Sequence, residues 1–203
     1  MNRFRFTLLA VSLVLSLLGL HDLKLWISNP GPLSIGIADL QQGRAPREWL
    51  RIEGGVFDLP EAISTSGTIE LEAFLVPLRS DLSDHRLRIL VETRDPEIMN
   101  LMRRWAFGFD TEKERRGFLE ANRDRFYPRR TVTGMVVGGL IASGNRDRLM
   151  QLARELGLEV DDQVIFISEG KQPPRWRGLF FLLVGLAGLI KGVQLVRRGK
   201  SAG

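Results

Sequence analysis

The sequence contains no cysteine and only two histidines among its 203 residues. The missing cysteine excludes disulfides, a thiol nucleophile, and zinc or iron-sulfur sites held by cysteine. It does not indicate a compartment, because cysteine-free proteins occur on either side of a membrane. Internal repeats, low-complexity tracts and motifs that define a reaction are also lacking, so the composition narrows the function without specifying it.

Acidic residues are scarce at the two ends of the chain. The net charge of +5 therefore does not describe the central region. Residues 28–170 carry 19 Lys and Arg against 23 Asp and Glu, a net charge of −4. The two ends carry ten basic residues and one acid, Asp22, a net charge of +9. Basic residues beside apolar runs set membrane orientation and contact anionic headgroups. We therefore expect no nucleic-acid binding, since the basic charge lies outside the central region.

Two uncharged stretches are also strongly apolar and lie near the ends of the chain, Phe6–Leu20 and Gly178–Ile190. We expect a transmembrane helix in each end of the chain, residues 1–27 and 171–203, on either side of one domain, residues 28–170. The first run has no small-x-small cleavage site at its end, which favours an uncleaved signal anchor over a cleaved signal. In the second, Lys191 can extend its amine to the basic side so that Gly192–Val196 completes the span. The alternative, a surface helix, fits poorly because Gly178–Ile190 is apolar all round.

Small residues recur on one face of each predicted span. Helical spacing aligns Ser12, Ser16 and Gly19 in the first span, and Gly185, Gly188 and Gly192 in the second. Such faces let two backbones approach closely. We expect the two helices to pack on each other or on a helix of a partner.

The basic residues also predict an orientation. Two spans place both termini on one side, which carries more Lys and Arg than the side of the loop. We therefore expect an integral protein of a bacterial cytoplasmic membrane, with its termini in the cytoplasm and its domain in the periplasm. On the terminal side lie Arg3, Arg5, Lys191, Arg197, Arg198 and Lys200, and on the loop side Lys24, Lys171, Arg175 and Arg177.

The central region predicts an α+β domain with five or so curved, mostly antiparallel strands. Gly54-Gly55 suggests a bulge in the first strand, and Pro77 is expected to end the second. Two helices, the first capped by Asp95 and separated from the second near Gly108, are expected between the third and fourth strands, and a third helix at 146–156 before the fifth. This order fits an OB-like, partly open barrel, and it also fits a sandwich with helices on one face. The predicted strands cover residues 49–59, 68–77, 87–91, 129–142 and 160–168, and the two inserted helices cover 96–109 and 111–125.

Aromatic residues of the first inserted helix are candidates for partner binding. Trp105, Phe107 and Phe109 could anchor a partner, with Arg103 and Arg104 at the rim of the interface. The alternative is that these aromatic side chains belong to the core.

Catalysis has weaker candidates. Asp81, Asp84 and His85 could hold a cation, although turns collect such residues for backbone hydrogen bonding. Ser143 lies between a predicted strand and helix, but helix capping by Asn145 explains this segment and no nucleophile motif surrounds it. No cofactor is expected.

The layout of helix, small domain and helix is similar to that of membrane-bound cytochrome oxidase assembly factors. No signature residue of that family is matched, so we assign no family. We expect a two-span membrane protein whose domain binds, scaffolds or assembles something, with membrane lipid and a membrane protein or a second copy as partners. A membrane-bound hydrolase or metal-dependent enzyme is the alternative.

Overall fold

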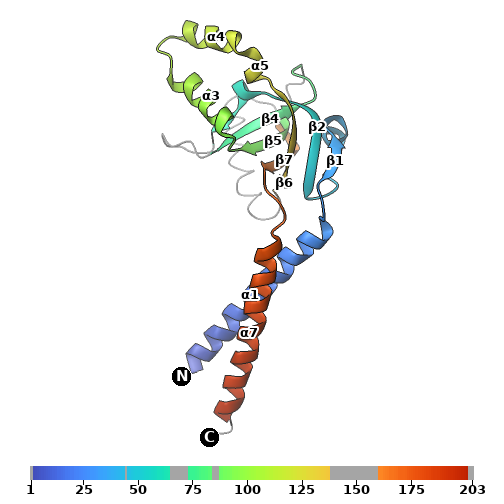
Figure 1. Cartoon of the computed structure of the whole chain (residues 1–203), viewed down its shortest axis with the longest axis vertical. Coiled ribbons are helices and arrows are strands. Elements are labelled where there is room, and N and C mark those ends of the chain that lie inside the picture. The colour runs from blue at the N-terminus through green and yellow to red at the C-terminus, as the bar shows by residue number, and fades with distance from the viewer. Residues whose placement is uncertain (1, 44, 65–72, 84–86, 138–159, 201–203) are drawn as a thin grey trace. The chain divides into compact units, whose positions relative to one another are not determined.

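The computed structural model describes residues 2–43, 45–64, 73–83, 87–137 and 160–200. The chain forms two compact units (Figure 1). One, the helical hairpin, combines residues 1–30 with 173–203. The other, the barrel domain, comprises residues 31–172.

The helical hairpin consists of α1 (Asn2–Ser28) and α7 (Arg175–Lys200), which pack against each other. Each contains a segment of 23 residues that is long and apolar enough to cross a membrane, Phe6–Ser28 and Arg175–Arg197. At the helical rise such a segment measures about 34 Å, against a hydrocarbon core of about 30 Å. Helix α1 ends at Ser28, and the buried side-chain amide of the next residue, Asn29, donates to the carbonyl oxygen of Leu25 at 2.9 Å.

The barrel domain is built on five strands that close on themselves. Around the barrel the order is β2, β6, β7, β5, β4 and back to β2, where Val56 pairs with Arg79. The β5–β7 pair is parallel and the other four pairs of the barrel are antiparallel. The expected α+β class with mostly antiparallel strands is confirmed, and the five strands form a closed barrel rather than a sandwich. The strands are β2 (Trp49–Phe57), β4 (Phe74–Arg79), β5 (Leu87–Thr93), β6 (Arg129–Val136) and β7 (Val160–Glu169).

Two short strands extend the sheet beyond the barrel. Strand β1 (Leu33–Gly36) pairs in parallel with β2, and β3 (Ile63–Ser64) pairs antiparallel with β4. Helix α2 (Ile37–Gln42) follows β1, and a 3₁₀ turn, η1 (Leu59–Glu61), precedes β3. The sequence pattern predicts no strand before Trp49, because Leu33–Gly36 is too short and mixed to show alternation.

The predicted bulge in β2 is confirmed. The register with β6 shifts between Ile52 and Gly55, and Gly54 adopts φ 79°, a conformation that favours glycine. A Cβ on Gly55 would lie only 2.5 Å from Cδ1 of Leu78. The bulge bends β2, so that its first half pairs with β1 and its end pairs with β4.

Pro77 does not end its strand, which corrects the prediction. Strand β4 continues to Arg79, and Pro77 lies opposite Leu90 of β5. The carbonyl oxygen of Pro77 accepts from the amide of Asp58 at 3.0 Å, on the side away from β5. Because N and O of one strand residue point to the same side, the missing N–H also faces away from β5, where β4 changes partner from β3 to β2. The proline therefore removes no hydrogen bond between β4 and β5.

Three helices join β5 to β6. Helix α3 (Pro96–Phe107) begins at Asp95, whose carboxylate accepts from the amide of Glu97 at 2.9 Å, as its capping pattern predicts. The single helix expected over 111–125 is instead two, α4 (Glu112–Ala121) and α5 (Arg123–Phe126). Asn122 causes the break, because its side-chain amide donates to the carbonyl of Phe118 at 2.8 Å and ends the helix there. The helix expected at 146–156 and the strand residues expected at 68–72 and 138–142 lie outside the described residues.

The main core fills the barrel and the space under α3. It contains side chains from all five barrel strands and from α2, α3 and α5. Fully or almost fully buried members are Leu40, Leu50, Ile52, Phe57, Leu59, Val76, Leu78, Ile89, Val91, Phe126, Val132 and Ile167. The core holds the helical insertion of α3–α5 on the barrel.

Candidate functional site

The small residues singled out from the sequence lie between α1 and α7. Ser12, Ser16 and Gly19 are buried in α1, and a Cβ added to Gly188 would lie 3.0 Å from Cβ of Ser12. A Cβ added to Gly185 would lie 2.7 Å from the backbone nitrogen of Ser16. Gly19 and Gly192 are equally close to the other helix, to the backbone of Leu182 and to the side chain of Leu9. The two small faces therefore meet within one chain.

An ion pair crosses the same helix interface near one end. Nε and Nη2 of Arg177 in α7 lie 2.8 and 3.0 Å from the two carboxylate oxygens of Asp22 in α1. The Asp22 side chain is 8% exposed, whereas that of Arg177 is 61% exposed. No local pattern in the sequence predicts this pair, because Asp22 and Arg177 lie 155 positions apart.

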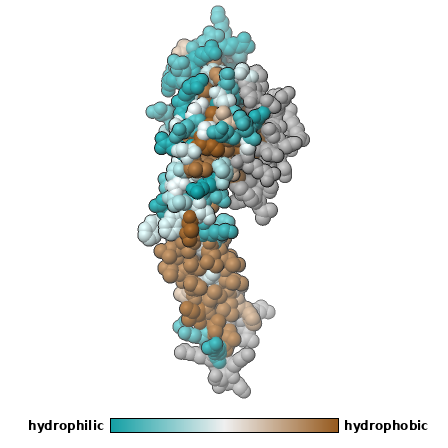
Figure 2. All heavy atoms as spheres, turned by 90° about the vertical axis from the view of Figure 1, so that its right-hand side faces the viewer, coloured by the Kyte–Doolittle hydropathy of each residue, from teal (hydrophilic) through white to brown (hydrophobic). Residues whose placement is uncertain are grey.

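The outer surface of the helical hairpin is apolar. Figure 2 shows hydrophobic residues over most of the visible face of this unit. Trp26 and Trp176, of a residue type enriched at membrane interfaces, are 37% and 81% exposed. Other large hydrophobic side chains that face outward are Phe6, Val11, Leu13, Val14, Leu17, Leu18, Leu20, Ile27, Leu179, Phe180, Leu183, Val184, Leu186, Ile190 and Val193.

The structure places the three aromatic candidates, two on α3 and Phe109 just beyond it, in different surroundings. Trp105 packs on the core and meets Phe126 edge to face, with ring centroids 5.6 Å apart. Phe109 packs on Phe118 at 4.9 Å. Phe107 is 68% exposed, the one large hydrophobic side chain so exposed in the described part of the barrel domain.

Arginines cover the inner aromatic residues. The guanidinium carbons of Arg104 and Arg115 lie 5.2 and 5.7 Å from the ring centroids of Phe118 and Trp105. Arg104 therefore stabilises the helical insertion through a cation–π contact. Arg103 is exposed on the same helix one turn before Phe107.

A buried charge cluster lies at the end of β4. Arg79 is 1% exposed, and its Nε lies 3.2 Å from the Asp58 carboxylate. Its Nη2 also donates to Glu61. Burial, followed by the charge of Asp58, raises the pKa of Tyr127 nearby. No sequence signal marked this cluster, since Asp58, Glu61 and Arg79 meet only when the barrel closes.

A second ionic network connects α3 to β6 and β7. The guanidinium of Arg130 lies 2.9 Å from Asp95 and 2.7 Å from Glu169, and its carbon is 5.3 Å from the ring centre of Phe57. Burial raises the pKa of Asp95, but the hydrogen bonds from Arg130 and from the amide of Glu97 outweigh it and leave this pKa below its ordinary value. The network fixes the start of α3 on the sheet.

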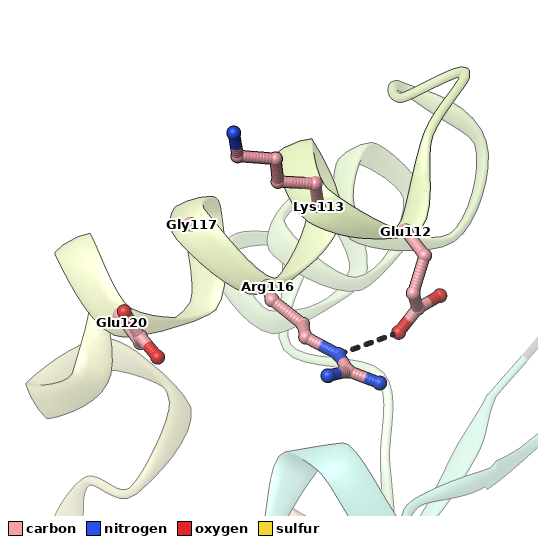
Figure 3. Close-up of a pocket in the computed structure, with 5 residues that line it drawn as sticks. All are labelled: Glu112, Lys113, Arg116, Gly117 and Glu120. Atoms are coloured by element: carbon pink, nitrogen blue, oxygen red, sulfur yellow. Dashed lines mark hydrogen bonds and ion pairs between the residues drawn. The ribbon is translucent and has the colours of Figure 1, made fainter.

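The described surface also has an open hollow along α4 (Figure 3). Glu112, Lys113, Arg116, Gly117 and Glu120 line it. Arg116 lies 3.2 Å from Glu112, and Arg115 pairs with the same carboxylate. These are neighbours on one exposed helix, so the hollow has no enclosed volume in which to hold a ligand.

Of the catalytic and metal-binding candidates, the structure describes Asp81 alone. Asp81 is exposed and accepts from the amide of Ser83 at 3.2 Å, a local turn contact. Asp84, His85 and Ser143 lie outside the described residues. Among the residues that the structure describes, no group of three acidic or histidine side chains could hold a metal ion.

Comparison with protein-family models, with curated proteins and with solved structures found no match to this chain.

Proposed function

We propose that this chain is an integral membrane protein with two spans, α1 and α7, whose barrel domain binds, scaffolds or assembles a partner at the cell envelope. The observation that carries the first part is the apolar outer surface of the helical hairpin. In water such a surface is unstable, because exposed apolar patches on soluble proteins rarely exceed a few hundred Å². In a bilayer the same surface contacts lipid tails, so no apolar area is exposed to water.

Extraction tests the membrane proposal directly. Membranes from cells that express the full chain are washed with alkaline carbonate, which releases peripheral proteins. We expect the chain to stay in the membrane pellet and to dissolve only in detergent. Recovery in the aqueous fraction would contradict the proposal.

The proposal extends to an uncleaved α1 and to termini in the cytoplasm, with the domain in the periplasm of a bacterium. The excess of Lys and Arg on the terminal side supports this orientation. A reporter fused at Gly203 that is active only in the cytoplasm would agree with it. The mass of the purified chain should include residues 1–27.

The barrel belongs, in this proposal, to the OB type. Its five strands and the helical insertion between the third and fourth barrel strands, β5 and β6, support this assignment. OB barrels commonly bind extended ligands on one face, which fits a binding module by analogy of fold alone.

Phe107 and Arg103 are the proposed contact with a membrane-protein partner. Both are exposed on α3, and an exposed aromatic residue beside arginine is typical of an interface hot spot. The full chain is extracted in mild detergent, and the proteins that co-purify are identified by mass spectrometry. We expect Phe107→Ala to lose the partner and Lys113→Ala, an exposed change on α4, to keep it. Retention of the partner by Phe107→Ala would contradict this surface.

A further inference from the structure

Asp22 is the one acidic residue in the sequence of α1 and α7, and it lies inside the apolar segment Phe6–Ser28. It is 6% exposed overall, although nothing in its local sequence requires burial. Its carboxylate is held by both Nε and Nη2 of Arg177, and His21 Nδ1 lies 3.9 Å away. This two-point geometry is the strongest form of a carboxylate–arginine pair.

Glycines make this contact possible. A Cβ added to Gly178, next to Arg177, would lie 2.8 Å from Cβ of Asp22. One turn away, a Cβ on Gly19 would lie 2.8 Å from the carbonyl oxygen of Gly178. The helices therefore approach closely beside the ion pair, so that Arg177, in the first turn of α7, reaches Asp22 while remaining helical.

Asp22 depends on Arg177. A carboxylate placed alone in an apolar environment is costly, so removing Arg177 would leave the buried Asp22 uncompensated, whereas Arg177 is 61% exposed and can be hydrated. Helix α1 without α7 would expose Asp22 to lipid or to an unsatisfied interface. The small residues from Ser12 to Gly19 allow close packing, but packing alone permits a slip by one turn.

We propose, on the basis of the proposed membrane insertion, that Asp22 and Arg177 form an interhelical clamp. The pair holds α1 and α7 in a single antiparallel register, and each span is completed by the other. Asp22 and Arg177 are positioning residues, and they set which small residues face each other along the rest of the hairpin.

Because the chain has no cysteine, a single introduced thiol can report on separation of the two helices. Ser12 is 3% exposed at the helix interface, ten residues from Asp22, which is about 15 Å along the helix. A Ser12→Cys thiol reacts with a small maleimide only when the helices separate. Leu13→Cys, at a neighbouring position that is 51% exposed, measures access of the reagent in the same detergent.

Four chains carrying Ser12→Cys are compared: the otherwise unchanged chain, Asp22→Asn, Arg177→Gln and the double variant. We expect each single change to accelerate labelling by about 5–30-fold, as a change of one or two kcal/mol would. The double variant should label no faster than the faster single variant, because both changes remove the same interaction. Lys24→Gln, an exposed basic residue nearby, should leave the rate unchanged.

Unchanged labelling in the single variants, or multiplied rates in the double variant, would overturn the clamp. If Asp22→Asn fails to insert, Asp22→Glu is tested instead. This variant keeps the charge and should insert and label like the parent chain. Failure of both variants would mean that the position requires the shape of aspartate and not its charge, which would overturn the proposal. Carbonate extraction of the parent chain tests membrane insertion separately. A chain that inserts but labels equally in all variants refutes the clamp alone.

Discussion

Arg79 has the largest fully buried side chain in the described structure, and it is charged. Asp58, which is 9% exposed at its side chain, depends on it, whereas Glu61 is 32% exposed and can be hydrated. Because removing one partner strands a buried charge, we expect Arg79→Met to lower the free energy of unfolding by about 3–5 kcal/mol. Denaturant unfolding of the full chain in detergent measures the loss.

The matched control is Arg116→Met on α4. Arg116 pairs with Glu112 at the surface, where water screens the pair, so its removal should leave the free energy of unfolding almost unchanged. Equal losses for the two variants would mean that the burial of Arg79 adds nothing to its pairing.

Asp95 should give the domain a measurable acid sensitivity. Its pKa is lowered in the folded state, so its charge contributes stability above the unfolded value of about 3.9 and this contribution is lost as pH falls through the folded pKa. Asp95→Asn keeps a good helix cap but removes the charge. We expect the parent chain to exceed this variant in denaturant midpoint near neutral pH, and the gap to close below about pH 4. A gap that does not depend on pH would contradict the role of the charge.

At the scale of elements, the helix interface depends on glycine. A side chain at position 188 would overlap Ser12, so Gly188→Ile should push α1 and α7 apart. We expect the thermal midpoint of the full chain in detergent to fall by several degrees, as a loss of about 1–2 kcal/mol would produce. Leu186→Ile, at a position 45% exposed on the outer face, is the control. Equal midpoints for the two variants would show that the small face does not stabilise the hairpin.

Helix α3 shows which side chains hydrophobic periodicity can assign to the core and which it cannot. Ile98, Leu101, Met102 and Trp105 recur every three or four residues, and this stripe faces the core. Phe107 falls outside the stripe and is exposed, so the spacing alone could have distinguished it from Trp105. Phe109 lies beyond the end of the helix, and only the position of Phe118 on α4 determines where its ring packs.

At the scale of the whole molecule, two spans place both termini on one side of the bilayer. Single cysteines at Asn2, Ser83 and Lys200 should therefore divide into two groups when intact cells are treated with a thiol reagent that cannot cross membranes. With the proposed orientation, Ser83→Cys is labelled, and Asn2→Cys and Lys200→Cys are labelled only after lysis. Labelling of one terminal cysteine but not the other in intact cells would contradict the two-span topology.

The sequence by itself determined the features that depend on local order: two apolar helices, the basic residues beside them, the glycine bulge in β2 and the Asp95 cap. Hydrophobic runs, helix capping and glycine conformations act over a few residues, so they can be read in order along the chain. Tertiary structure alone decided that the barrel closes between β2 and β4, that β4 continues through Pro77, and that Arg79 and Asp22 find their partners. These contacts join residues far apart in sequence. They stabilise the protein only after folding has brought both partners together.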